Sequence, residues 1–148
     1  MTQEINLYIL TEAKGNTAES GRVAYELETV QGGKKVHRDY RTYLPDRNRN
    51  GAMLEGLCDA FTHVLPGKDI RMNVYSEAIM MHTHITNGNI FTWEKNGFTK
   101  SDGSPVAYAD LWEPITRDIR EKLKCRITMC TGIPLDIRQR LDKMIKEP

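Results

Sequence analysis

The sequence lacks a long apolar segment and an excess of charge of either sign. No apolar run approaches the roughly 18 residues that a membrane helix needs, and residues 1–6 do not read as a secretory signal peptide. We therefore expect a protein that does not associate with membranes. Twenty-one lysine and arginine residues oppose twenty acidic residues, and the resulting net charge of +1 excludes a protein that binds polyphosphate through bulk charge. A local basic patch is still allowed.

Cysteine is also scarce. The three cysteines, Cys58, Cys125 and Cys130, form an odd set without Cys-x-x-Cys spacing. Disulfide bonds are rare in the reducing cytoplasm, where a buried cysteine usually packs as a small apolar side chain. We therefore expect three reduced, buried thiols in a cytoplasmic protein.

The rest of the composition is that of an ordinary folded domain. Of the 148 residues, 39% are apolar and 28% are charged, which is close to the averages of globular proteins. The chain contains no internal repeat, low-complexity segment or linker. We therefore expect residues 1–148 to form a single domain that is long enough to bury a sizeable core.

Hydrophobic periodicity predicts three strands followed by alternating helices and strands. Residues 31–34 (Gln-Gly-Gly-Lys) supply a turn between two alternating segments, which indicates an antiparallel meander. The expected order β-β-β-α-β-α-α-β-α is that of a mixed α/β layer fold, with a loop at residues 99–107. The expected strands are 5–10, 22–30, 36–44, 69–75 and 125–130, and the expected helices are 52–65, 77–85, 111–123 and 135–145.

Two neighbouring stretches resemble motifs of the type 1 ribonucleases H. Residues 93–100 (Trp-Glu-Lys-Asn-Gly-Phe-Thr-Lys) resemble the family's Trp-Lys-x-x-Gly-Trp-x-x, and residues 103–112 resemble its x-x-Pro-Val-x-Asn-x-Asp-Leu-Trp. Looser matches at 7–12, 15–16 and 140–144 extend the resemblance over almost the whole chain. The resemblance implies a ribonuclease H-like α/β fold, with a five-stranded mixed sheet and helices on both of its faces.

The resemblance also implies a site in which four carboxylates hold two divalent ions, Mg²⁺ or Mn²⁺, that cleave RNA–DNA hybrids. The first acid falls at Glu12, where the family has Asp, and the extra methylene moves the carboxylate by about 1.5 Å. The second falls at Met53. Glu55 is an alternative, but helical periodicity places it about 200° around the helix from Met53. With Met53 as the anchor, Leu57 and Phe61 fall on the buried stripe.

Of the third and fourth acid positions, only the fourth is occupied by an acid in this sequence. Tyr75 stands at the third, and a neutral phenol does not replace a carboxylate shared by two cations. Glu77, two residues further on, is an alternative ligand. Asp142 matches the fourth acid, and Ile133 stands where the family's loop histidine would be. With Glu12 and Asp142 as the residual metal ligands, we expect impaired or absent two-metal hydrolysis and a largely apolar pocket.

A nucleic-acid surface is implied in the same way. The residues that match the family's hybrid-binding positions are Asn16, Asn50, Trp93, Lys95, Phe98 and Lys100. Glu94 replaces a basic residue among them and dilutes the positive charge. His82 and His84 are two residues apart on an expected helix, so they point about 200° apart and we interpret them as solvated side chains rather than a metal pair.

Three functions are compatible with these residues. The first is a degenerate ribonuclease H-like domain that binds nucleic acid without cutting it. The second is an active, metal-dependent hybrid ribonuclease whose site is rearranged around Glu12, Glu77 and Asp142, with Glu55 as a further candidate ligand. The third is a protein-interaction module on the same fold, with an adaptable surface of methionines. The methionines considered for that surface are Met72, Met80, Met81 and Met129.

Overall fold

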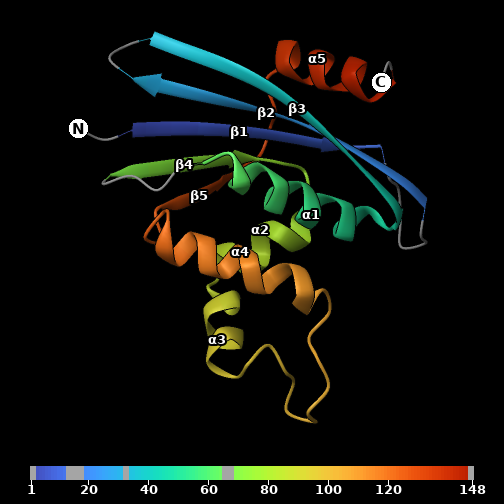
Figure 1. Ribbon diagram of the computed structural model, residues 1–148, viewed down its shortest axis with the longest axis vertical. Coiled ribbons are helices and arrows are strands. Elements are labelled where there is room, and N and C mark those ends of the chain that lie inside the picture. The colour runs from blue at the N-terminus through green and yellow to red at the C-terminus, as the bar shows by residue number, and fades with distance from the viewer. Residues whose placement is uncertain (1–2, 13–18, 32–33, 65–68, 147–148) are drawn as a thin grey trace.

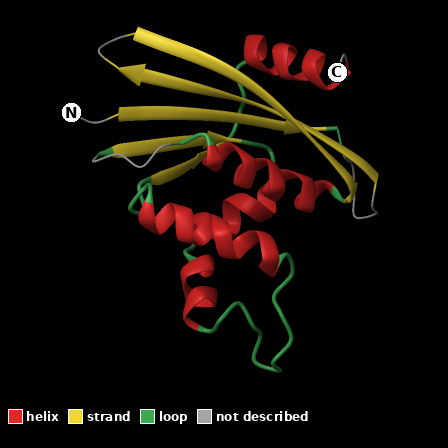
Figure 2. Cartoon of the chain, viewed as in Figure 1, coloured by secondary structure: helices red, strands yellow, loops and turns green. Residues whose placement is uncertain are grey.

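Five strands form one twisted sheet in the computed structural model, which describes residues 3–12, 19–31, 34–64 and 69–146 (Figures 1 and 2). The strand order is β3-β2-β1-β4-β5. The β1–β2 and β2–β3 pairs are antiparallel, while β1–β4 and β4–β5 are parallel, which confirms the meander and the mixed α/β fold. The strands are β1 (Gln3–Thr11), β2 (Glu19–Gln31), β3 (Lys34–Arg47), β4 (Ile70–Tyr75) and β5 (Ile127–Cys130).

Helices cover both faces of the sheet. In Figure 1, α1, α2 and α4 lie on one side of the sheet and α5 lies on the other. Side chains that alternate along β1 reach both layers: Leu7 and Ile9 join the larger core, and Tyr8 joins a second cluster beneath α5. The helices are α1 (Arg49–Thr62), α2 (Ile79–Thr86), α3 (Asn89–Lys95), α4 (Ala109–Glu121) and α5 (Leu135–Lys146).

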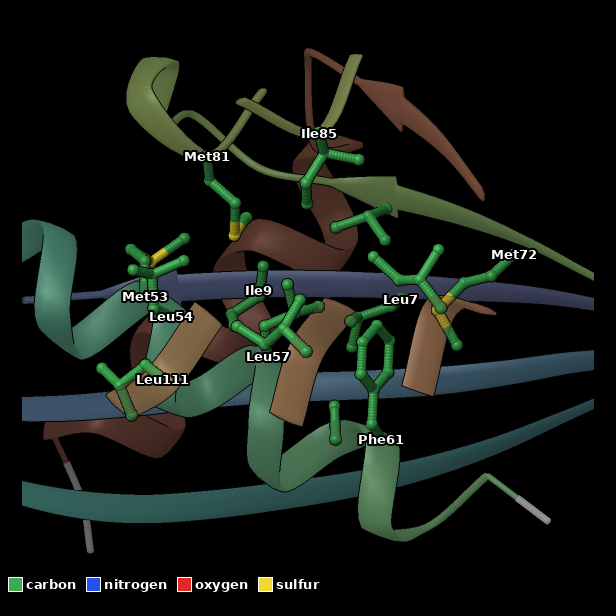
Figure 3. Close-up of a cluster of buried hydrophobic side chains, with 14 of the residues drawn as sticks. Leu7, Ile9, Met53, Leu54, Leu57, Phe61, Met72, Met81, Ile85 and Leu111 are labelled. Carbon is green, nitrogen blue, oxygen red and sulfur yellow. The ribbon is translucent and has the colours of Figure 1, made fainter. Parts of the chain in front are cut away.

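The larger core lies between the sheet and α1. Met53, Leu57 and Phe61 are all nearly inaccessible to solvent, which confirms the predicted buried stripe (Figure 3). Gly56, on the same helix, faces the sheet closely, because a Cβ built there would lie 2.6 Å from Cγ1 of Val23. The absence of a side chain at Gly56 therefore lets α1 pack directly on the sheet.

The helix α3 was not predicted from the sequence. It follows Gly88, whose φ of 73° ends α2 and redirects the chain. The turn at residues 87–89 was predicted, but a helix of seven residues is too short to show a clear hydrophobic period. Strands β2 and β3 also extend beyond the predicted ranges, since their polar ends lack an alternating pattern.

The cysteines are free, as predicted, but none of the three is fully buried. Cys125 is exposed in the turn between α4 and β5, where its φ of 63° reverses the chain. Cys58 and Cys130 are partly buried, and burial raises the pKa of the Cys58 thiol to about 12. Cys58 is therefore an unreactive thiol at neutral pH.

The methionine surface expected of a protein-interaction module is not present. Met72 and Met81 are fully buried, and Met80 and Met129 pack against the same core. These methionines therefore fill the interior. Within the described part of the chain, no helix is both long and apolar enough to cross a lipid bilayer.

Candidate nucleic-acid interface

The candidate site lies where β1 and β4 end. Because the two strands are parallel, their last residues reach the same edge of the sheet, and α5 packs across β1 and β2 beside this edge. A groove of about 550 Å³ opens there between the end of β1 and α5. Glu12 and Asp142, which were expected from the sequence as residual metal ligands, both line this groove. The complete lining is Leu10, Thr11, Glu12, Leu135, Arg138, Gln139, Asp142 and Lys146.

Two of the acids at this edge lie beside basic side chains. The carboxylate of Glu12 lies 3.7 Å from Nε of Arg22 on β2. The carboxylate of Asp142 accepts a 2.9 Å hydrogen bond from Nζ of Lys146, one turn further along α5. That contact raises the pKa of the Lys146 ammonium above its ordinary value, so Lys146 is charged at neutral pH. Both acids are therefore already balanced by cations of the protein itself.

Glu77, the alternative ligand that follows Tyr75, is held by an arginine from α5. Arg138 donates a hydrogen bond to the Glu77 carboxylate and forms an ion pair with it. The pKa of the Arg138 guanidinium is raised by this hydrogen bond first and by the charge of Glu77 second, with Asp142 as a further contribution. Arg49, at the start of α1, donates a 3.3 Å hydrogen bond to the carbonyl oxygen of Glu77. Two arginines therefore converge on Glu77.

The groove combines charged and apolar side chains, because Leu10 and Leu135 line it together with Glu12, Arg138, Asp142 and Lys146. Neither Met53 nor Tyr75 lines it. Met53 is 3% exposed and lies beside Leu54 within the larger core (Figure 3). Tyr75 stacks on Tyr8 across β1 and β4, with ring centroids 4.8 Å apart, in the cluster beneath α5. Burial raises the pKa of both phenols, so neither supplies a negative charge near neutral pH.

The residues present do not fit a two-ion centre. Among the described residues, no group of three or more His, Cys, Asp or Glu side chains is placed to hold a metal ion. Mg²⁺ needs several oxygen ligands at near-octahedral positions. Here Glu12, Glu77 and Asp142 instead have Arg22, Arg138 and Lys146 as their partners.

The residues that match hybrid-binding positions divide into exposed and buried groups. Lys95 and Lys100 are exposed on α3 and on the loop that follows it. Phe98 is 7% exposed in the larger core. Trp93 is partly buried against Trp112 and His84, at ring distances of 5.9 and 4.7 Å respectively. The two aromatic side chains therefore hold the segment in place, and the two lysines are the accessible groups.

Of the two asparagines that match hybrid-binding positions, Asn50 lies among the described residues. Asn16 lies outside the described residues. Asn50 is partly buried in the first turn of α1, where Asn48 is the residue that caps the helix. The side-chain oxygen of Asn48 accepts hydrogen bonds from the Gly51 amide at 2.9 Å and from the Tyr108 hydroxyl at 2.8 Å. Asn48 thus fixes the start of α1 at the edge of the site.

The sequence suggested solvated side chains at His82 and His84, but both are partly buried and contact neighbouring groups. Nε2 of His82 lies 2.8 Å from the carbonyl oxygen of Ser76, and His84 packs edge-on against Trp112. Partial burial lowers the pKa of His84, which keeps its ring neutral at pH 7. Both histidines therefore brace α2 against its neighbours.

Arg138 and Lys146 were not predicted from the sequence as residues of the site. Both lie four residues from Asp142, and side chains four apart on a helix lie on one face. This spacing was the available signal. Arg22 gave no such signal, because its contact with Glu12 depends on the pairing of β1 with β2.

Neither a family model nor a curated protein matches the sequence. The structure is similar to that of LC9-RNase H1, with a TM-score of 0.74 and 15% identity over 97% of this chain and 71% of the other. LC11-RNase H1, solved with an RNA/DNA hybrid, is similar with a TM-score of 0.60 and 17% sequence identity. The match covers 97% of this chain and 94% of the other. The RNase H domain of prototype foamy virus is similar with a TM-score of 0.60 and 12% sequence identity. The match covers 98% of this chain and 90% of the other. These likenesses, with the strand order and the helices on both faces, establish that the chain has a ribonuclease H-like fold.

Proposed function

We propose that this ribonuclease H-like domain binds an RNA–DNA hybrid through its phosphate backbone, with little or no metal-dependent cleavage. The observation that carries the proposal is the pairing of Glu12, Glu77 and Asp142 with cations of the protein. Four basic side chains lie among these three acids, so a surface that would otherwise repel phosphates is neutral to positive. These basic residues are Arg22, Arg49, Arg138 and Lys146.

A nucleic acid as the ligand is supported by the fold and by a second exposed basic segment. LC11-RNase H1, whose fold this chain shares, was solved in complex with an RNA/DNA hybrid. Lys95 and Lys100 are exposed on the helix and loop before α4. Phosphate contacts from lysine and arginine contribute most of the sequence-independent affinity for nucleic acid.

A rearranged metal-dependent enzyme is less well supported. Its ligands would be Glu12, Glu77 and Asp142, and each would have to exchange an ion pair with the protein for a metal ion. A protein partner is supported only by two exposed aliphatic side chains, Ile79 and Leu135, which are 80% and 70% exposed. Single exposed apolar residues are common on soluble proteins. We therefore rank hybrid binding first.

Fluorescence anisotropy with a labelled RNA–DNA hybrid, measured in EDTA over a series of salt concentrations, tests the proposal. We expect binding at low ionic strength that weakens steeply as salt rises. Lys146→Glu should weaken binding, because it reverses a charge in the groove. Arg126→Glu is the matched control, since Arg126 pairs with Asp69 near the starts of β4 and β5, at the other end of the strands. Absence of salt-dependent binding, or equal loss in both variants, would contradict the proposal.

A further inference from the structure

Arg138 lines the groove and forms an ion pair with Glu77, an acid outside its lining. Its guanidinium is paired with Glu77, which follows β4, and Asp142 lies one turn further along α5 on the same face. The charge of Asp142 acts on Arg138 together with that of Glu77. One side chain from α5 therefore pairs with the acid that follows β4, on the helix face that also carries Asp142.

Carboxylates that converge on one site repel each other unless a cation lies among them. In metal-dependent sites a divalent ion supplies that positive charge. Here the charge is supplied by a guanidinium, which remains protonated at every physiological pH. Lys146 and Arg22 add one positive charge each beside Asp142 and Glu12.

Arg138 also retains hydrogen-bonding capacity toward solvent. Its side chain is 42% exposed and lines the groove. A guanidinium has five N–H donors in a planar arrangement that matches the oxygens of a phosphate. The pair with Glu77 therefore leaves donors that can reach a ligand in the groove.

We propose that Arg138 is a built-in cation that takes the place of a divalent metal at this edge. It neutralises Glu77, as Lys146 neutralises Asp142, and donates to a phosphate of the bound strand, so that the groove binds its ligand without metal. The phosphate part of this inference rests on the proposed function. The replacement of the metal rests on the ion pairs alone, so it can be tested without nucleic acid.

The first experiment measures Mn²⁺ binding by paramagnetic broadening of backbone amide signals in the free protein. In the wild-type chain, substoichiometric Mn²⁺ should not selectively broaden the signals of Glu77 and Asp142. In Arg138→Ala the signal of Glu77 should broaden, because its carboxylate loses its ion-pair partner, whereas Asp142 keeps Lys146. Arg138→Lys keeps the charge and should behave as wild type, and Arg126→Ala removes an exposed arginine from another ion pair as the control. Selective broadening in the wild type, or none in Arg138→Ala, would overturn the inference.

The second experiment compares hybrid affinity in EDTA and in Mg²⁺ at constant ionic strength. The wild-type affinity should be the same in both buffers. Arg138→Ala should bind more weakly in EDTA, and the slope of log affinity against log salt should fall by about 1, as expected for one lost phosphate contact. Affinity that depends on Mg²⁺ in the wild type, or an unchanged slope in Arg138→Ala, would overturn the role of Arg138. If the wild type binds no hybrid, the proposed function fails, and the Mn²⁺ experiment alone still decides whether Arg138 replaces a metal.

Discussion

Glu12 and Asp142 line the same groove, and each lies within 4 Å of a basic side chain of its own chain: Arg22 at 3.7 Å and Lys146 at 2.9 Å. The two acids come from opposite ends of the sequence, and the packing of α5 against the sheet brings them together. Their pairing changes what the edge can bind. Carboxylates that already have cationic partners bind a metal ion less strongly, and basic groups beside them attract phosphate.

A carboxylate introduced at position 53 should destabilise the protein. Met53→Glu should lower the free energy of unfolding by about 3 kcal/mol, because it places a carboxylate at a position that is 3% exposed in an apolar core. Met53→Leu, which keeps the volume and polarity, should cost less than about 1.5 kcal/mol. Urea unfolding followed by circular dichroism measures both values. Equal stability of Met53→Glu and the wild type would show that position 53 opens to solvent.

The pair between Arg140 and Glu26 should fix α5 on the sheet. Glu26 is fully buried on β2, and Nη2 of Arg140 donates to both of its carboxylate oxygens at 2.8 and 3.0 Å. Arg140→Ala should lower the free energy of unfolding by about 2 kcal/mol, because a buried carboxylate loses a charged partner. The cost stays below that of a fully buried pair since the Arg140 side chain is 46% exposed.

Arg120→Ala is the control for this comparison. Arg120 pairs with Glu94 on the exposed surface between α4 and α3, at 3.0 Å. Exposed pairs of this kind contribute little to stability, so the control should unfold at nearly the wild-type urea concentration. A similar loss of stability in both variants would mean that burial of Glu26 adds nothing to the pair.

His84 should make the protein less stable in acid. Burial lowers its pKa in the folded state below the ordinary 6.5, so the unfolded chain binds a proton more readily. The free energy of unfolding should therefore be unaffected above about pH 6.5 and should fall as the pH drops from there through the lower folded-state pKa. Urea titrations at several pH values measure this slope. His84→Gln should flatten it, whatever its effect on the stability at neutral pH, and an unchanged slope would exclude His84 as its source.

The two exposed lysines before α4 should contact the nucleic-acid backbone. Changing Lys95 and Lys100 together to alanine should weaken binding of the hybrid and lower the salt slope by about 2, because each lost phosphate contact accounts for about 1. The matched control changes Lys124 and Arg126, two exposed basic residues at the other end of α4. Anisotropy titrations over a salt series provide both slopes. A slope that falls equally in the two double variants would assign the loss to net charge instead.

Much of the fold could be predicted because the sequence patterns are local. The alternation of strands and the spacing of Met53, Leu57 and Phe61 depend on residues close together in the chain. The turn before α3 was visible in the sequence, but the seven-residue helix after it was too short to recognise. Local pattern therefore predicted the layers and missed the smallest helix.

The candidate site was less predictable, because its contacts join residues far apart in the chain. The resemblance directed attention to acids, and it gave no reason to look for Arg138 beside Glu77 or Arg22 beside Glu12. Met53 and Tyr75 do not line the groove as expected, because Met53 turns into the core and Tyr75 stacks beneath α5. A side chain that stands at an expected acid position does not have to point into the groove. Basic side chains from α5 and β2 lie beside the acids at this edge instead.

Cleavage of a labelled RNA–DNA hybrid under single-turnover conditions, with the protein in excess and with Mg²⁺ or Mn²⁺ present, tests the central claim most directly. Products are separated on a denaturing gel, and binding is verified in the same samples by anisotropy. The account predicts that the hybrid is bound and stays intact with either ion. Cleavage that Glu12→Gln or Asp142→Asn abolishes, while binding persists, would contradict it and would show that these acids exchange their cations for metal.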